Sequence, residues 1–128
     1  MDPQRLRRVA AAALLPWAAA SAQADAGSVR LLVQSSPLAG FRHYEAAQAW
    51  PEMRVGDPLE LAREADNPHD PRAVAVSWRG RMLGYVPRRE NAALAWAMDR
   101  GERLRARITR LSPHPNPARR LAFEVYIE

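Results

Sequence analysis

The sequence predicts a mainly β domain, a small curled sheet or barrel of five to six short strands, with one clear helix and a candidate for a second, short one. Apolar and polar residues alternate with period two in several short segments, which is typical of half-buried strands. Gly- and Pro-rich turns separate these segments, and the chain holds 11 Pro and 6 Gly. Its 128 residues include no Cys, so one packed core without disulfides is expected.

The N-terminal segment has the three parts of a secretory signal. Three Arg lie within residues 5–8, an apolar run follows over residues 9–20, and Ala22-Gln23-Ala24 matches the A-x-A cleavage pattern. We therefore predict a signal peptide at residues 1–24 and a mature domain at residues 25–128, periplasmic or secreted after cleavage near Ala24. The alternatives are a wrongly chosen start codon, or an uncleaved Ala-rich helix in a cytoplasmic protein.

The apolar run predicts no permanent membrane anchor. It extends for about twelve residues, whereas a helix that crosses a bilayer needs roughly twenty, and Pro16 interrupts it. We therefore expect no membrane span in the mature chain.

The charge favours an anionic partner without requiring one. The formal net charge is +5, and because residues 1–24 hold three Arg and one Asp, cleavage lowers it to +3. Every basic residue is Arg, which GC-rich coding explains as well as selection does. Guanidinium groups nevertheless suit phosphate and carboxylate binding.

The first half of the domain predicts two strands around a short helix. Val29, Leu31 and Val33 alternate with polar residues over residues 28–34, so this segment is a half-buried strand. Residues 45–50 are Ala-rich and precede Pro51, which predicts about two helical turns. A strand over residues 59–63 then ends at a rigid polar turn, residues 66–71, because its two prolines and its Asx residues cannot continue a ladder.

The second half predicts a hairpin, a helix and an antiparallel pair of strands. Residues 73–78 and 82–86 alternate on either side of a turn at Gly80. Residues 90–100 carry apolar residues at helical spacing, and Gly101 is placed to end that helix. Alternation returns over residues 104–108 and 121–127, on either side of a Pro-rich loop.

Two side-chain sets in these segments have competing interpretations. Arg103, Arg105 and Arg107 make a stripe that suits a phosphate track, but glutamates on the neighbouring strand favour cross-strand ion pairs. The large aromatics in the periodic segments are assigned to the core, since a small domain obtains much of its buried area from them. These core aromatics are Trp78, Tyr85, Trp96 and Phe123.

Three separated motifs resemble the HIRAN domain family in order and spacing. The first is GDPLELARE at residues 56–64, which fits G-D-x-L-x-L-x-R-E. The second is NPHDPRAVAV at residues 67–76, which fits N-P-x-D-x-x-A-I/V-x-V, and the third is GYVPR at residues 84–88. Each motif alone is weak, but together they identify the chain as a member from about Leu31 to its C-terminus.

This resemblance implies a small OB-like β-barrel with flanking helices and a non-enzymatic function in nucleic-acid binding. In the best-understood relatives the domain holds the 3′ end of a DNA single strand. By motif, Asn67 then takes the role of an amide that reads a base edge, Asp70 accepts the terminal hydroxyl, and Arg42 contacts phosphate. His43 and His69 stand where the DNA-binding relatives have tyrosine, which predicts weaker base stacking or a different ligand.

The candidate site therefore combines two stretches of chain with an arginine pair. Arg88 and Arg89 lie just before the predicted helix and would add phosphate contacts at its N-terminus. The complete candidate set for nucleic-acid binding is Arg42, His43, Asn67, His69, Asp70, Arg88 and Arg89. The set requires the turn at residues 67–70 to lie beside the segment at residues 41–43.

Each of these residues also has a purely structural interpretation. Asx residues beside proline stabilise turns by binding their own backbone, and an arginine pair is often a solvated turn. The main alternative for the whole protein is an exported binding or adaptor protein of the cell envelope, whose same barrel holds a protein, a peptide terminus or another anionic ligand. Single-stranded DNA remains the leading partner, and we expect a monomer.

The sequence offers no basis for an enzyme, a metal site or a cofactor. His43, His69 and His114 have no i, i+3 or i, i+4 spacing and no Cys partners. The acidic residues Glu64 and Asp66 lie near Asp70, but no second half of a metal-dependent nuclease site is visible. No Gly-rich phosphate loop is present either.

Overall fold

The computed structural model describes residues 30–128, of which Leu31–Glu128 form one compact unit. The predicted signal peptide at residues 1–24 lies outside the described residues and stays a prediction. No helix among residues 30–128 combines the length and the apolar character needed to cross a bilayer.

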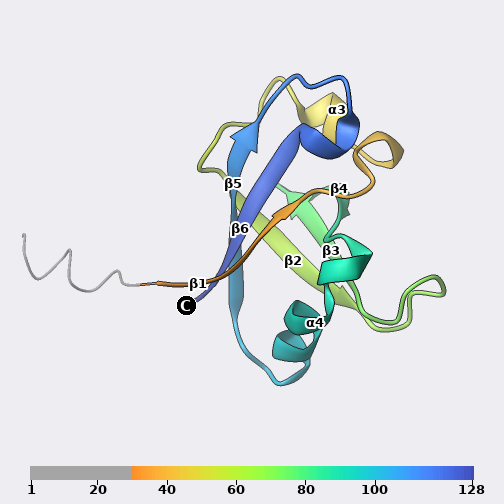
Figure 1. Cartoon of the computed structure of the whole chain (residues 1–128), viewed down its shortest axis with the longest axis vertical. Coiled ribbons are helices and arrows are strands. Elements are labelled where there is room, and N and C mark those ends of the chain that lie inside the picture. Colours follow the sequence, from red (N-terminus) through yellow and green to blue (C-terminus); the bar gives the residue numbers. More distant parts are fainter. Residues whose placement is uncertain (1–29) are drawn as a thin grey trace, which may run out of the picture. The chain divides into compact units, whose positions relative to one another are not determined.

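Six strands and a few short helices make up the described domain (Figure 1). The strands are β1 (Leu31–Pro37), β2 (Pro58–Glu64), β3 (Ala73–Trp78), β4 (Arg81–Tyr85), β5 (Leu104–Leu111) and β6 (Leu121–Ile127). The α-helices are α3 (Ala46–Ala49) and α4 (Ala92–Asp99), and the 3-10 turns are η1 (Phe41–His43), η2 (Arg88–Glu90) and η3 (Pro117–Arg119). The predicted mainly β, OB-like class is confirmed.

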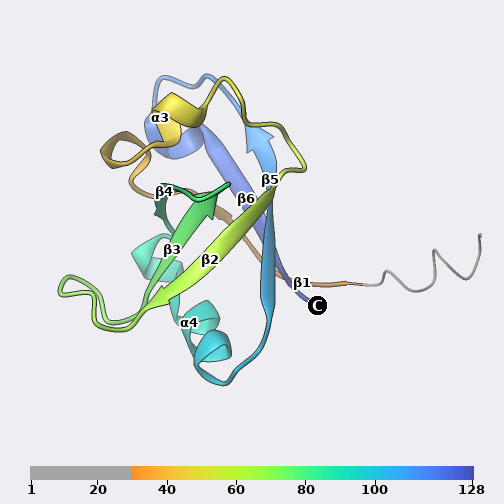
Figure 2. The same ribbon diagram turned by 180° about the vertical axis from the view of Figure 1, so that it is seen from behind.

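All six strands form one antiparallel sheet in the order β1-β6-β5-β2-β3-β4. The predicted hairpin is β3–β4, turning at Gly80, and the predicted pair of C-terminal strands is β5–β6. In both views of the ribbon, α3 lies near one end of the sheet and α4 near the other (Figure 2). The Gly101 amide donates to the Met98 carbonyl at the end of α4, as the sequence indicated.

The sheet curls without closing into a barrel, so of the two forms that the sequence predicted, a curled sheet or a barrel, the structure has the curled sheet. Its outer strands, β1 and β4, form no ladder with each other. They approach through one isolated bridge, in which Ala39, just after β1, exchanges two backbone hydrogen bonds of 2.9 Å with Tyr85. This bridge brings the chain before η1 against the end of β4.

The core fills the inside of the curl, and its members come from every strand except β1. Trp78, Leu83, Ile108 and Phe123 are among the fully buried residues. The Trp78 indole donates to Asp57 Oδ2 over 3.0 Å, so the largest core side chain keeps its polar atom satisfied. This contact gives the Asp of the G-D motif a scaffolding role.

Two aromatics assigned to the core lie elsewhere. Trp96 is 58% exposed on the outer face of α4, because the buried residues of this short helix, Leu94, Ala95 and Ala97, turn the opposite way. Tyr85 is only partly buried and lines a surface hollow. Periodicity identified the elements correctly but did not show which side of each element was covered.

The first strand also differs from its expected position and face. It begins at Leu31 rather than residue 28, and Leu31 and Val33 are exposed instead of buried. The ladder with β6 is irregular between Leu32 and Gln34, and such a bulge reverses the faces beyond it. Ser36 is the buried residue of this edge strand.

Candidate nucleic-acid interface

A surface hollow of about 340 Å³ lies between the β2–β3 loop and the end of β4. We call it the Asp70 hollow. Its lining residues include Ala39, Tyr44, Asn67, Asp70, Tyr85 and Arg88. It therefore joins residues of the second and third sequence motifs with Ala39 and Tyr44, which lie on either side of η1.

Asn67 shapes the loop from inside. Its Oδ1 accepts hydrogen bonds from the His69 and Asp70 amides, at 2.9 and 3.3 Å, and its Nδ2 donates to Glu64 Oε1 over 3.0 Å. The Asx-turn role expected from proline-flanked Asn is therefore present. A ligand that forms a hydrogen bond with the Asn67 side chain therefore does so in addition to, or in place of, its bonds to the loop amides and Glu64.

Replacing Asn67 with Ala is expected to lower the free energy of unfolding by about 1–2 kcal/mol, because three hydrogen bonds of a partly buried side chain are lost. Hydrogen–deuterium exchange at the His69 and Asp70 amides should accelerate. Asn116→Ala is the matched control, since Asn116 Oδ1 accepts only from the Ala118 amide in a different loop. Unchanged exchange at both amides would contradict the turn role.

Asp70 presents a carboxylate that stays ionised. Its Oδ1 accepts from the Arg72 amide at 3.0 Å, and its Oδ2 accepts from Asn91 Nδ2 at 2.7 Å. Burial raises the pKa of Asp70, but these two hydrogen bonds and the charges of Arg88 and Arg72 outweigh it and hold the pKa below its ordinary value. The hollow thus contains an acceptor-only group with lone pairs to spare.

Asn91, which supplies one of these hydrogen bonds, is itself 1% exposed at the start of α4. The opposite end of its amide, Oδ1, is buried and has no hydrogen-bond partner among the described residues. The carboxylate determines which way the amide faces, because an oxygen turned toward Asp70 would be repelled. Asn91 therefore works as a buried donor that positions Asp70.

Two tyrosines supply the aromatic wall of the hollow. The rings of Tyr44 and Tyr85 meet edge to face, with centroids 5.7 Å apart. The Tyr85 hydroxyl donates to Glu64 Oε1 over 2.7 Å; this hydrogen bond, desolvation and the nearby negative charge raise the pKa of Tyr85 to about 12. Glu64, the last residue of the first motif, thus orients both Tyr85 and Asn67.

The first motif also anchors the helix behind the hollow. Arg63 forms a two-pronged ion pair with Asp99 at 3.1 and 3.2 Å, and donates to the Ala73 carbonyl. This contact ties the C-terminal end of α4 to β2. Of the last two residues of the first motif, Arg63 therefore has a structural role, and Glu64 bonds Asn67 and Tyr85 of the hollow.

The predicted residues from η1 lie next to the Asp70 hollow rather than in it. Arg42 and His43 line a smaller neighbouring hollow of about 200 Å³, together with Asn116 and Pro117 of the β5–β6 loop. We call this the Arg42 hollow. The residues on either side of η1, Ala39 and Tyr44, line the Asp70 hollow, so the two candidate stretches are adjacent but do not converge on a single pocket.

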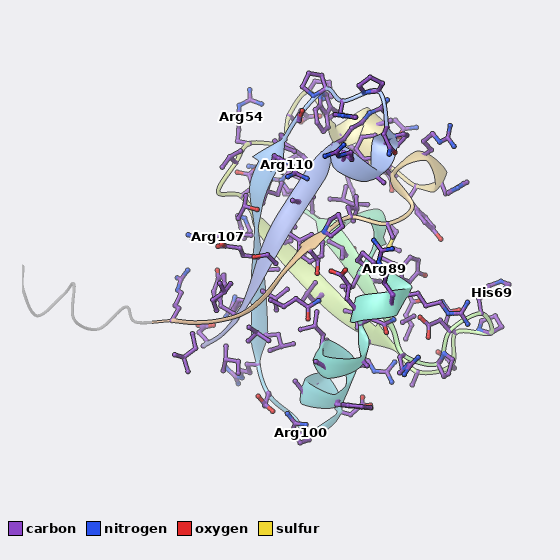
Figure 3. The ribbon with its side chains drawn as sticks, viewed as in Figure 1. Arg54, His69, Arg89, Arg100, Arg107 and Arg110 are labelled. Atoms are coloured by element: carbon purple, nitrogen blue, oxygen red, sulfur yellow. The ribbon has the colours of Figure 1, made fainter. Side chains whose placement is uncertain are left out.

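The remaining predicted residues have different surroundings. Arg88 lines the Asp70 hollow, whereas its neighbour Arg89 lines a third, separate depression. Because η2 intervenes before α4, neither arginine sits at the helix N-terminus as expected. His69 is exposed at the tip of the β2–β3 loop (Figure 3) and also lines the Asp70 hollow, together with Asn67 and Asp70.

Two of the three arginines in the predicted stripe, Arg105 and Arg107, follow the ion-pair interpretation, whereas Arg103 lies just before β5. Arg107 bonds Glu124 over 3.2 Å, and Arg105 pairs with Glu128. Within residues 30–128, no three His, Asp or Glu side chains gather in a way that would hold a metal ion.

Sequence reasoning missed the hollow's aromatic and buried polar members. Tyr85 was assigned to the core although it belongs to the third motif, and Tyr44, which directly follows Arg42 and His43, received no role. The motif position of Tyr85 was the available signal. Nothing in the local sequence indicated the contact of Asn91 with Asp70, since 21 residues separate them.

Comparison with known proteins supports the family suggested by the motifs. The HIRAN domain family model matches residues 31–128. A solved protein from Lactobacillus plantarum is 25% identical, with a TM-score of 0.67 over 77% of this chain and 95% of that one. The HIRAN domain of human HLTF shares the fold, with 20% identity and a TM-score of 0.59 over 77% of this chain and 78% of that one. No curated protein sequence matches the chain.

The family match covers the whole described sheet and includes each of the three motifs. The hollow that these motifs build combines an ionised carboxylate, an amide, two aromatic rings and an arginine. The chain therefore belongs to the HIRAN domain family, whose domains are nucleic-acid-binding modules.

Proposed function

We propose that this domain binds the 3′ end of single-stranded DNA in the Asp70 hollow and has no catalytic activity of its own. The observation that carries the proposal is the ionised Asp70 carboxylate beside the Tyr44 and Tyr85 rings. A 3′-hydroxyl is a hydrogen-bond donor at the end of a ligand that also has a flat base. The hollow offers the Asp70 carboxylate as an acceptor for the 3′-hydroxyl and the tyrosine rings as a stacking surface for the base.

The charge of the hollow favours a hydroxyl end over a phosphate end. A terminal 3′-phosphate would bring negative charge against Asp70, whose pKa is held low by hydrogen bonds from Arg72 and Asn91. A strand that continues past this point would carry a phosphodiester in the same place. The carboxylate therefore selects ends, and Arg88 supplies a cation for the preceding phosphate.

Tyr44 and Tyr85 can supply the base stacking that is weaker at His43 and His69, the two positions where the DNA-binding relatives have tyrosine. His69 lies at the exposed rim of the Asp70 hollow, and His43 lies in the Arg42 hollow. Tyr44 is 39% exposed, so part of its ring is open to a base. Base stacking on an aromatic contributes about 1–3 kcal/mol per base, which makes Tyr44 the side chain with most to add to affinity.

Fluorescence anisotropy with labelled oligonucleotides tests this function. We expect a 3′-hydroxyl strand to bind at least tenfold more tightly than the same strand with a 3′-phosphate, because the second places like charges together. Binding should weaken as salt rises, since phosphate contacts release counterions. Equal affinity for the two ends, or no binding at 50 mM salt, would overturn the proposal.

A further inference from the structure

The largest depression described on the domain lies away from the Asp70 hollow and is strongly basic. It measures about 500 Å³ and lies between β1, η2, the end of β5 and η3. Its lining includes Ser35, Ser36, Arg89, Arg110, Asn116 and Arg119. We call it the basic groove. Figure 3 labels two of its arginines, Arg89 in η2 and Arg110 near the end of β5.

The three arginines come from three separate elements and are not engaged by the protein. Arg89, Arg110 and Arg119 are exposed, and among the described residues none of their side chains makes an ion pair or a hydrogen bond. By contrast, Arg105 and Arg107 on the same sheet are paired with glutamates. The arginines of the groove are thus available to a ligand.

No acidic residue lines the described groove. The nearest carboxylate by sequence, Glu90, already accepts a 2.6 Å hydrogen bond from the Ser36 hydroxyl, and its backbone carbonyl accepts from Gln34 Nε2. These contacts hold η2 against β1. The lining of the groove therefore gathers three positive charges, with the Glu90 carboxylate behind Ser36 as one nearby negative charge, and this excess favours an anionic occupant with several charges.

The groove shares lining residues with the Arg42 hollow and has a sequence neighbour in the Asp70 hollow. Asn116 and Ala118 line both the basic groove and the Arg42 hollow. Arg88 and Arg89, adjacent in η2, line the Asp70 hollow and the basic groove respectively. A flexible chain that ends in the Asp70 hollow can therefore leave it past η1 or η2 toward the groove.

We infer that the basic groove binds the phosphodiester backbone of a nucleic-acid strand, on the 5′ side of the nucleotide held in the Asp70 hollow. Three spaced guanidinium groups suit a repeating anion, because each forms two-pronged hydrogen bonds with one phosphate. This inference rests on the proposed function for the direction of the strand. It adds a second, sequence-independent site that the end-binding hollow alone does not provide.

The test compares the wild-type domain with a variant that carries Arg89→Gln, Arg110→Gln and Arg119→Gln. A twelve-nucleotide strand and a trinucleotide, both with a 3′-hydroxyl, are titrated at several salt concentrations. Each lost contact to single-stranded DNA changes the log–log salt slope by about 0.7, so the variant's slope with the long strand should be shallower by about 2. Its affinity for the trinucleotide should stay within about twofold of wild type.

The control variant removes the same charge elsewhere, through Arg100→Gln, Arg103→Gln and Arg105→Gln. Arg100 lies far from Arg110 in Figure 3, and Arg105 is already paired with Glu128. The salt slope of this control variant should differ from the wild-type slope by no more than about 0.7, the change expected from one lost phosphate contact. A control that weakens long-strand binding as much as the groove variant overturns the groove, because net charge alone then explains the loss.

Arg110→Gln alone is the second variant and should give about one third of the slope change, which keeps the test valid if the triple variant folds poorly. An unchanged slope in both groove variants overturns the groove but leaves end binding intact. Salt-sensitive wild-type binding without end preference, lost in the groove variants, supports the groove and sinks the end-binding proposal. Equal competition by poly-glutamate and by DNA overturns the assignment to nucleic acid.

Discussion

Gly84→Ala should lower the free energy of unfolding by about 3 kcal/mol, because among the described glycines Gly84 has the least room for a Cβ. A Cβ at Gly84 would lie 2.2 Å from the Ala39 carbonyl oxygen and 3.2 Å from the Leu38 side chain. Leu38 is fully buried, and Ala39 belongs to the bridge with Tyr85. Neither neighbour can move without breaking core packing or backbone hydrogen bonds.

Urea unfolding followed by Trp fluorescence measures this effect. Gly80→Ala is the matched control, because nothing lies within 4 Å of a Cβ at Gly80 and only its positive φ of 78° opposes a side chain. That strain costs about 1–2 kcal/mol. Equal losses in the two variants would show that close packing against Ala39 is unimportant.

The same substitution should also weaken binding at temperatures where the variant remains folded. Ala39 and Tyr85 form the bridge between the two outer strands, and both line the Asp70 hollow. Forcing them apart displaces Tyr85 from Tyr44 and widens the hollow. Gly80→Ala, in the turn at the other end of β4, leaves this wall in place.

Asp70→Asn is expected to reduce the preference for a 3′-hydroxyl over a 3′-phosphate by tenfold or more. The change removes the negative charge that repels the phosphate and weakens a charge-assisted hydrogen bond worth about 1.5–3 kcal/mol. Competition anisotropy with the two oligonucleotides measures the ratio directly. Asp66→Asn, which makes the same charge change at an exposed position of the preceding turn, is the control and should keep the wild-type preference.

The Asp70→Asn domain should still fold, so the test is one of binding. An Asn side chain at this position can still accept from the Arg72 amide. Its new Nδ2 faces Asn91 Nδ2, but rotation of the Asn91 amide presents Oδ1, which has no partner in the described structure. An end preference that survives in the variant would contradict the role given to Asp70.

The pH dependence gives an independent check on Asp70. Because its folded-state pKa is depressed, the ionised carboxylate stabilises the folded domain at pH values above the ordinary Asp pKa, about 4, and this contribution is lost as pH falls through the folded value. Below about pH 4 the wild-type domain should therefore lose stability faster than Asp70→Asn. Parallel stability curves for the two proteins from pH 6 to pH 2 would show that Asp70 is not held ionised.

Local patterns predicted most strands because each strand is a local alternation with one covered face. The hairpin around Gly80 and the β5–β6 pair follow directly from period-two segments and their turns. β1 was the exception, since a bulge between Leu32 and Gln34 changes which side chains face the core. An edge strand is also covered by fewer neighbours, so an apolar residue in it is a weaker indication of a buried position.

The candidate site was predicted in part. The sequence indicated the Asn67–Asp70 turn, and the motifs associated it with Arg88, which lines the same hollow. It assigned Arg42 and His43 to one shared site, whereas they line an adjacent hollow. It gave Tyr85 to the core because an aromatic in an alternating segment is normally covered, and only the open edge between β4 and Ala39 leaves that ring accessible.

The sequence by itself determined the class of fold, the family motifs and the polar turn, because each depends on residues that are neighbours along the chain. The tertiary structure decided which distant residues meet: Asn91 with Asp70, Tyr44 with Tyr85, and Arg89 with Arg110 and Arg119 around one groove. These meetings depend on the curl and the register of the sheet. Both are properties of the long-range pairings among strands, which no local pattern encodes.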